Sequence, residues 1–270
     1  MNITRLLPLS YLSWCLGALA NLPLPQPLAR WSIQIFVRAY GIDVTTATEP
    51  LEHFRSIGAF FTRDIKPQER PLGAGFICPV DGTLRQYCGL TPGQDISQVK
   101  GREYTLEALL GGDDFTRRLS SGALWNLYLS PADAHHIFAP IGGRIVKTVH
   151  IPGKLWPVND WALHSVDGLF AVNERIVTYI ETEKELVAVV MIGATNVGRI
   201  ALGYMQLETN RRPWQAKAIS KFEHTDKVVS AGDKLGTFKM GSSVIVIAES
   251  YRASQPQGAT PRKVRYGEVL

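Results

Sequence analysis

The sequence has only three cysteines, and no internal repeat is visible in it. Cys15, Cys78 and Cys88 are odd in number and lack the paired spacing of zinc ligands. Neither a disulfide framework nor a metal site is therefore indicated, and a reducing compartment fits this cysteine usage best. With 270 residues, 45% of them hydrophobic, the chain can bury one large core or two modest ones.

Long runs of lysine or arginine are also missing, although the formal net charge is +5. A positive chain favours anionic partners, which include nucleic acid, an acidic membrane surface and acidic substrates. A nucleic-acid footprint usually concentrates its charge and interleaves aromatic residues along one face. We therefore expect a membrane surface, and no nucleic acid, as the anionic partner.

No apolar run is long enough to form a membrane-spanning helix. The stretch Leu6–Leu28 is apolar, but a helix of about 20 residues is prevented by its prolines, Pro8, Pro23, Pro25 and Pro27. A cleaved signal peptide is an alternative, because Ala18-Leu19-Ala20 has the small-x-small form. Its apolar core is short, however, and the cysteine usage is not that of an exported protein.

Two helices are expected next, over Ala29–Tyr40 and Leu51–Arg63. The first has a composition suited to a membrane interface, but packing against a core remains the alternative, since apolar residues cover most of its circumference. We assign residues 1–65 to an N-terminal helical segment that associates with the membrane. The expected location is peripheral, on the cytoplasmic side of the cell membrane.

From Ile77 onward, short β-rich runs alternate with glycine and proline. Many short strands with few helices between them predict an α+β fold with a largely antiparallel β-sandwich or barrel-like core, assigned to residues 66–270. Val228–Phe238 is predicted to form a strand, a turn and a second strand, and Arg252–Leu270 a polar surface tail. The other expected strands are Thr83–Cys88, Ala123–Leu129, Arg144–Val149, Arg175–Ile180, Leu186–Ile192, Arg199–Met205, Ala216–Phe222 and Ser243–Ala248.

Three stretches have polar residues that packing alone does not require. Asp81 lies in a proline and glycine turn just before a strand, where most aspartates only cap their own backbone. Ser130 as N-cap, followed by Pro131 and Asp133, predicts the start of a short helix, with His135 just beyond it. The third stretch is Gly241-Ser242, a tight turn that leads into a β-branched run.

Taken together, these stretches and several others resemble the phosphatidylserine decarboxylases, and the resemblance covers nearly the whole chain. The order and spacing of the motifs carry it, since any one of them alone would be weak. They are Phe60-Phe61-Thr62-Arg63, Pro79-Val80-Asp81-Gly82, Leu129-Ser130-Pro131-Ala132-Asp133, Ile151-Pro152-Gly153-Lys154-Leu155, Leu169-Phe170-Ala171-Val172-Asn173-Glu174-Arg175, Gly193-Ala194-Thr195-Asn196-Val197-Gly198 and Gly236-Thr237-Phe238-Lys239-Met240-Gly241-Ser242-Ser243.

The resemblance implies an enzyme that cleaves itself between Gly241 and Ser242. Ser242 would become a covalent pyruvoyl group, which would replace a separate cofactor in converting phosphatidylserine to phosphatidylethanolamine and CO₂. The β and α chains produced by the cleavage would remain associated, and the family suggests a homodimer. A pyruvoyl decarboxylase of a related amino acid derivative is an alternative.

By position, Asp81 resembles the acid that orients the base for serine activation, and His135 the histidine of the decarboxylation step. The chain departs from the family at Phe138, where a second histidine usually serves as that base. His136 and His164 are alternative bases. Because phenylalanine cannot transfer a proton, an unprocessed, non-catalytic lipid-binding homologue is a further alternative.

The residues that hold the lipid headgroup are left open by the sequence. Arg211, Arg212 and Trp214 form a basic and aromatic cluster that suits a headgroup, but a solvated loop has the same composition.

Overall fold

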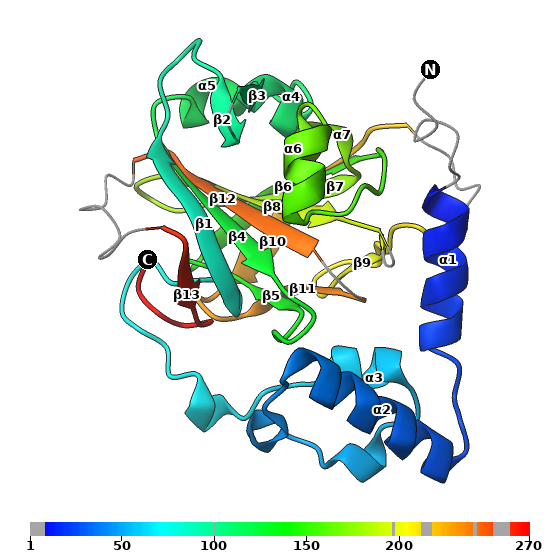
Figure 1. Ribbon diagram of the computed structural model, residues 1–270. Helices are drawn as coiled ribbons and strands as arrows, with labels where there is room; N and C mark the ends of the chain where they lie inside the picture. Colours follow the sequence, from blue (N-terminus) through cyan, green and yellow to red (C-terminus); the bar gives the residue numbers. More distant parts are fainter. Residues whose placement is uncertain (1–8, 100, 196–197, 212–217, 240–241, 251–259) are drawn as a thin grey trace, which may run out of the picture.

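The computed structural model describes residues 9–99, 101–195, 198–211, 218–239, 242–250 and 260–270. Its centre is an eight-stranded antiparallel sheet in the order β10-β6-β7-β8-β12-β4-β1-β13 (Figure 1). The strands are β1 (Gly82–Gly89), β4 (Ala123–Leu129), β6 (Gly143–Ile151), β7 (Arg175–Glu181), β8 (Leu186–Gly193), β10 (Ser220–Val229), β12 (Ser242–Ala248) and β13 (Arg262–Val264).

Both faces of this sheet are buried. Successive side chains of a strand point to opposite faces, so each central strand contributes to two apolar clusters. In β12, Val244 and Val246 belong to one apolar cluster, and Ile245 and Ile247 to the other. This two-sided burial explains why β8 and β12 are nearly continuous apolar runs in the sequence.

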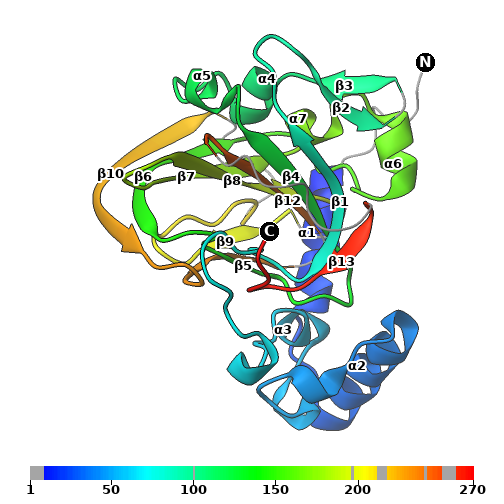
Figure 2. The ribbon, with the colours of Figure 1, turned by 90° about the vertical axis from the view of Figure 1, so that its left-hand side faces the viewer.

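The two faces are covered by different elements (Figure 2). A three-stranded sheet lies against the first face, which gives the predicted sandwich; it consists of β5 (His136–Phe138), β11 (Lys234–Phe238) and β9 (Ile200–Leu202). Four short helices cover the second face: α4 (Leu106–Leu110), α5 (Thr116–Leu119), α6 (Asp160–Ser165) and α7 (Leu169–Val172). The hairpin β2 (Ile96–Val99) and β3 (Arg102–Tyr104) adjoins them. The α+β class and the antiparallel core are confirmed.

The N-terminal part is helical, as predicted. Its elements are α1 (Leu9–Ala20), α2 (Gln26–Tyr40), η2 (Val44–Thr46), η3 (Leu51–His53), α3 (Ile57–Phe61) and η4 (Pro67–Glu69). The helix expected over Leu51–Arg63 is divided into η3 and α3, because the Ser56 side chain accepts a hydrogen bond from the N–H of Ala59 and starts a new helix. Among the described residues, no helix has the length and apolarity needed to cross a membrane.

The prediction that Arg252–Leu270 is a surface tail is wrong for its last part. Residues 260–270 contain β13, which pairs with β1, and Val264 and Leu270 are buried. The N–H of Leu270 also donates to the carbonyl of Phe76 at 3.0 Å. A polar, basic composition conceals such a strand because its partner is far away in the sequence.

The short helix predicted to start at Ser130 is also absent, and a turn takes its place. The Asp133 carboxylate accepts hydrogen bonds from the N–H and the hydroxyl of Ser130, at 2.8 and 2.6 Å. Aspartate thus closes the turn with its side chain instead of capping a helix. The chain then enters β5, so that His136 and Phe138 lie on one face of an extended strand.

Candidate functional site

The ends of several neighbouring strands lie together at one end of the large sheet. Ser242, the first residue of β12, pairs with Leu129 at the end of β4 and with Gly193 at the end of β8. Gly82, the first residue of β1, lies on the far side of β4, where an added Cβ would come within 2.4 Å of the Tyr128 carbonyl oxygen. Asp81 precedes β1 and Ser242 begins β12, so both lie at this end of the sheet. β1 and β12 are separated by β4 alone, which corresponds to about 10 Å at the usual spacing of strands.

Asp81 is buried and bound by an arginine. Arg70 donates from Nε and Nη2 to the two carboxylate oxygens, at 2.8 Å each, and this bond raises the pKa of Arg70. The N–H of Tyr266 donates to the same carboxylate at 2.9 Å. Among the described residues, no imidazole hydrogen-bonds Asp81.

A cavity of about 360 Å³ opens beside Asp81. Phe138 lines it and stacks on Tyr266, with the ring centroids 3.8 Å apart and the planes at 17°. His136 lines the same cavity; its Nδ1 lies 2.9 Å from Thr237 Oγ1 and its Nε2 3.1 Å from Asp64 Oδ1. Burial, together with the positive charge of Lys234, lowers the pKa of His136. The structure therefore brings His136 and Phe138, but not His135, to the cavity beside Asp81.

His135 is completely buried, with its ring 3.9 Å from that of Phe61. Its Nδ1 lies 2.8 Å from the carbonyl oxygen of Asp133. A carbonyl can only accept, so Nδ1 carries the proton in a neutral ring and Nε2 presents a lone pair. Nε2 has no hydrogen-bond partner among the described residues, and burial lowers the pKa of His135 to about 3.

The Phe60-Phe61-Thr62-Arg63 motif holds the turn that carries His135. Phe61 packs on the imidazole, and Arg63, which is 3% exposed, donates from Nη2 to the carbonyl of Ala132 at 2.7 Å. The N-terminal helical segment is thus directly attached to the β-rich part at this turn.

His164, the other alternative base, belongs to a helix. It lies in α6 with an exposed side chain, and its Nδ1 donates to the carbonyl of Asp160 at 2.6 Å. Its backbone carbonyl accepts from Arg102 at 2.8 Å. None of these contacts brings His164 to Asp81, because α6 belongs to the helical layer.

A second polar group on the other side of β12 was not found from the sequence. Asn173 donates to the carbonyl of Gly193 at 2.9 Å, which places it one strand from Ser242. Next to it, Glu174 contacts His150 Nε2 at 2.8 Å and is also hydrogen-bonded by Asn210. Asn173 and Glu174 lie within a motif that carried the resemblance, but only the fold shows His150 opposite them.

Some predicted residues lie outside the described part of the chain. They are Gly241, the residue before the expected cleavage point, and Arg212 and Trp214 of the basic and aromatic cluster.

Comparisons with known proteins agree in their result. The family model described as phosphatidylserine decarboxylase matches residues 57–270. A phosphatidylserine decarboxylase proenzyme of Anaeromyxobacter is 39% identical, over 100% of this chain and 96% of its own length. Relatives of the same name from Myxococcus xanthus and Variovorax paradoxus are 38% and 37% identical, over 94% and 89% of this chain and 90% and 86% of their own lengths. The chain belongs to the phosphatidylserine decarboxylase family.

Proposed function

We propose that this protein decarboxylates phosphatidylserine to phosphatidylethanolamine and CO₂ after cleaving itself between Gly241 and Ser242. The observation that carries the proposal is the place of Ser242, the first residue of a central strand, beside the end of β4 from which the chain turns to His135. The family and the proenzyme names of the relatives support the same activity.

In the proposed maturation, the Ser242 hydroxyl attacks the Gly241 carbonyl and an ester replaces the peptide bond. Elimination then releases the Gly241 carboxylate, and hydrolysis of the dehydroalanine at position 242 gives ammonia and a pyruvoyl group. That group supplies an electron-accepting carbonyl for decarboxylation. Gly193, opposite Ser242, has no side chain to fill this edge, and the unpaired Nε2 of His135 fits a site that handles protons.

We assign the role of proton acceptor to His135. Its carbonyl accepts the N–H of Phe238 at 2.9 Å, while Leu129 pairs with Ser242. Leu129 therefore lies beside Ser242, and His135 lies beside Phe238. In the sequence, only residues 130–134 separate the first of these positions from His135, and only residues 239–241 separate Phe238 from Ser242. The lone pair of His135 at Nε2 can accept a proton and later return it to carbon. Because a pKa of about 3 makes this nitrogen a weak base, we expect maturation to be slow.

The two products of cleavage are expected to remain together. β12 lies within the sheet and is hydrogen-bonded along both edges, by β4 and β8. The last residues add β13, which pairs with β1. Residues 242–270 would thus be held by three neighbouring strands after the covalent link is lost.

A membrane surface is the proposed location of the substrate. Seven of the large apolar side chains exposed among the described residues belong to the first 40 positions: Trp14, Leu19, Leu22, Leu28, Trp31, Ile35 and Tyr40. In α2, Leu28, Trp31 and Ile35 lie on one helix face, whereas Ala29 and Ile33 are buried. α2 therefore packs with one face and presents another to a bilayer interface. A peripheral cytoplasmic location and a homodimer stay predictions.

Intact-mass measurement of the purified protein tests the proposal directly. We expect a fragment of 29 residues, from Ser242 to Leu270 (270 − 242 + 1), and production of phosphatidylethanolamine from phosphatidylserine vesicles. Ser242→Ala is expected to abolish both the fragment and the activity. A wild-type chain that stays full-length and releases no CO₂ would overturn the proposal.

A non-catalytic lipid-binding protein is the second candidate, and one arrangement favours it. Arg70 already occupies both oxygens of Asp81, and Phe138 stacks on Tyr266 in the place where a base is expected. In that case the wild type would bind phosphatidylserine vesicles as an uncut chain, and Ser242→Ala would bind equally well.

A further inference from the structure

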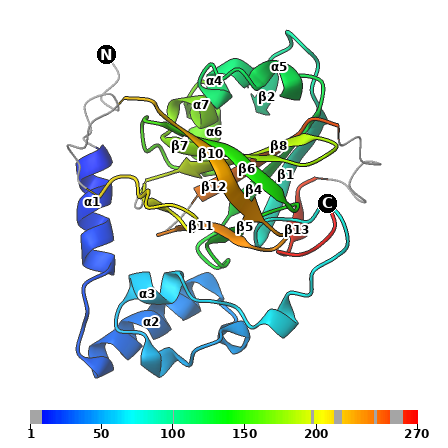
Figure 3. The same ribbon diagram turned by 180° about the vertical axis from the view of Figure 1, so that it is seen from behind.

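A second cavity, of about 230 Å³, lies between α1 and the segment around β9. In Figures 1 and 3, α1 stands beside this segment, and α2 and α3 lie below it. The indole N–H of Trp14 donates to the carbonyl of Arg211 at 3.3 Å and connects the two walls. The lining residues are Ser13, Trp14, Gly17 and Ala18 of α1, with Leu155, Arg199, Asn210 and Arg211 opposite.

Positive charge predominates at the wall opposite α1. Glu208 is the only carboxylate that Arg199, Arg211 and Lys239 contact among the described residues, at 3.6, 3.9 and 3.0 Å. Arg199 Nε is buried, yet it makes no hydrogen bond within the described part of the chain, since 3.6 Å is too long for one. Glu174, behind Asn210, is already bound by His150 and by Asn210. The cavity thus has more cationic donors than acceptors.

This cavity extends to the end of the sheet at which Ser242 lies. Leu155 accepts a hydrogen bond from the Thr195 hydroxyl, and a Cβ on Gly193 would be 3.4 Å from its Cδ2 atom. Gly193 is the direct neighbour of Ser242 in the sheet. One strand therefore separates the cavity from the proposed reacting residue.

We infer that this cavity binds the phosphate diester of the phospholipid substrate, with Arg199 and Arg211 as its ligands. The inference rests on the proposed function. Guanidinium groups match the geometry and charge of phosphate. The volume corresponds to roughly eight water molecules, which suffices for a phosphate ester but not for two acyl chains. The acyl chains would pass α1, where Leu19 is 69% exposed and available to the bilayer.

Steady-state kinetics on a soluble substrate test the site. Dihexanoyl phosphatidylserine below its critical micelle concentration removes the membrane from the assay. We expect Arg199→Gln with Arg211→Gln to raise KM about ten-fold or more, with kcat and the 29-residue fragment nearly unchanged, since a charged hydrogen bond typically changes affinity by that factor. Arg199→Lys should show an intermediate KM, because it keeps the charge but loses the fork of donors.

Arg117→Gln is the matched control, because Arg117 is exposed on α5, in the helical layer. If it raises KM as much as the double variant does, the inference is wrong. The double variant could instead show a raised KM only with anionic vesicles and not with the soluble lipid. The two arginines would then attract the protein to the membrane surface, and the inference of a phosphate site would be wrong.

Inorganic phosphate distinguishes the phosphate group from the rest of the headgroup. It should inhibit wild type competitively and the double variant far less, and equal inhibition of both would contradict the inference. If the wild type proves uncut and inactive, the proposed function fails separately. Binding of the same soluble lipid is then measured by calorimetry. Binding to wild type but not to the double variant would support the phosphate site, and equal binding to both would contradict it.

Discussion

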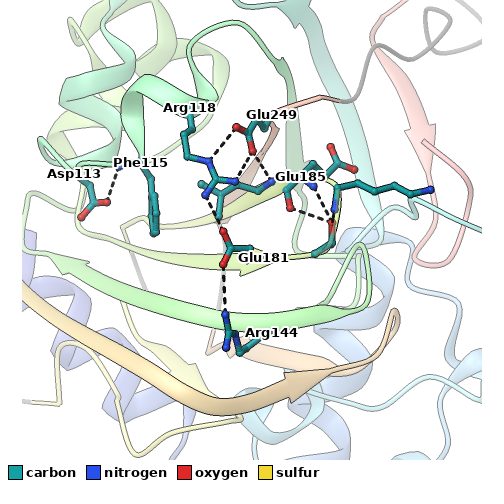
Figure 4. Close-up of polar contacts among 10 residues, drawn as sticks. Asp113, Phe115, Arg118, Arg144, Glu181, Glu185 and Glu249 are labelled. Carbon is teal, nitrogen blue, oxygen red and sulfur yellow. Dashed lines mark hydrogen bonds and ion pairs between the residues drawn. The ribbon is translucent and has the colours of Figure 1, made fainter.

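The two ends of β12 are held in different ways. At the far end, Glu249 accepts two hydrogen bonds from Arg118, at 3.0 and 2.8 Å, and one from the N–H of Leu186 at 2.9 Å. Figure 4 shows how Arg118 also reaches Glu181, which in turn contacts Arg144. These charges are mutually paired, and Arg118 lowers the pKa of Glu249.

The Ser242 end also has an ion pair nearby, between Arg70 and Asp81, but it adds a buried neutral group. His135 is uncharged and leaves Nε2 unpaired within the described residues, whereas nothing similar occurs in the Arg118 network. A paired charge fixes the chain, but an unpaired buried nitrogen costs stability and is a frequent mark of a functional group. The comparison therefore assigns anchoring to one end of the strand and chemistry to the other.

The strongest test of this division is His135→Gln. Removal of the proton-handling nitrogen should lower the decarboxylation rate by about 10²–10⁴-fold, the usual contribution of general acid–base catalysis. Turnover is measured on protein shown by mass to be cleaved, so that maturation and catalysis are separated. The control is His164→Gln, exposed on α6, which should match wild type. Wild-type turnover by cleaved His135→Gln would remove His135 from the mechanism.

The same residue predicts how stability depends on pH. The folded pKa of His135, about 3, lies below the ordinary 6.5, so the folded state binds fewer protons than the unfolded state between these values. Its stabilising contribution is complete above pH 6.5 and is lost as the pH falls toward 3. Between pH 7 and pH 4.5 the free energy of unfolding should fall by about 2–3 kcal/mol more in wild type than in His135→Gln.

Urea unfolding at the two pH values measures this difference, on the Ser242→Ala background to keep the chain intact. Parallel decreases in both proteins would show that the pKa of His135 is not lowered in the folded state.

A smaller effect is expected from Phe138→His. The new imidazole would enter the cavity that Asp81 lines, and we expect maturation to accelerate about ten-fold. This is below the usual range for a general base, because Arg70 already holds the Asp81 carboxylate. The half-time of fragment release is followed by mass. Phe138→Leu serves as the control for repacking, and equal half-times for both variants would contradict the prediction.

The strands of the sheet could be predicted from sequence because their signal is local. β4 was expected over Ala123–Leu129 and is found there, and β8 differs from its expected range by one residue, Gly193. A buried strand is recognised from its own apolar run, whatever its neighbours are. The class of fold followed from the number of such runs.

Features that depend on distant partners could not be predicted. Arg118 and Glu249 are separated by 131 positions, and Tyr266 and Asp81 by 185. The sequence did show that Phe138 cannot serve as a base. It did not show that Arg70 binds Asp81, or that the Nε2 atom of His135 is left unpaired, because these facts depend on which side chains meet.

The smallest predicted effect is at the anchored end, where Arg118→Gln removes the ion pairs to Glu249 and Glu181. Because Arg118 is 39% exposed, solvent screens these pairs, and the uncut Ser242→Ala chain should lose only about 1 kcal/mol of unfolding free energy. In the cleaved protein the same change should release residues 242–270 at lower urea concentration, because no covalent link then holds β12. Fragment dissociation is measured by size exclusion, with Arg117→Gln as the neighbouring control. Equal dissociation midpoints for the two variants would show that this end does not anchor the fragment.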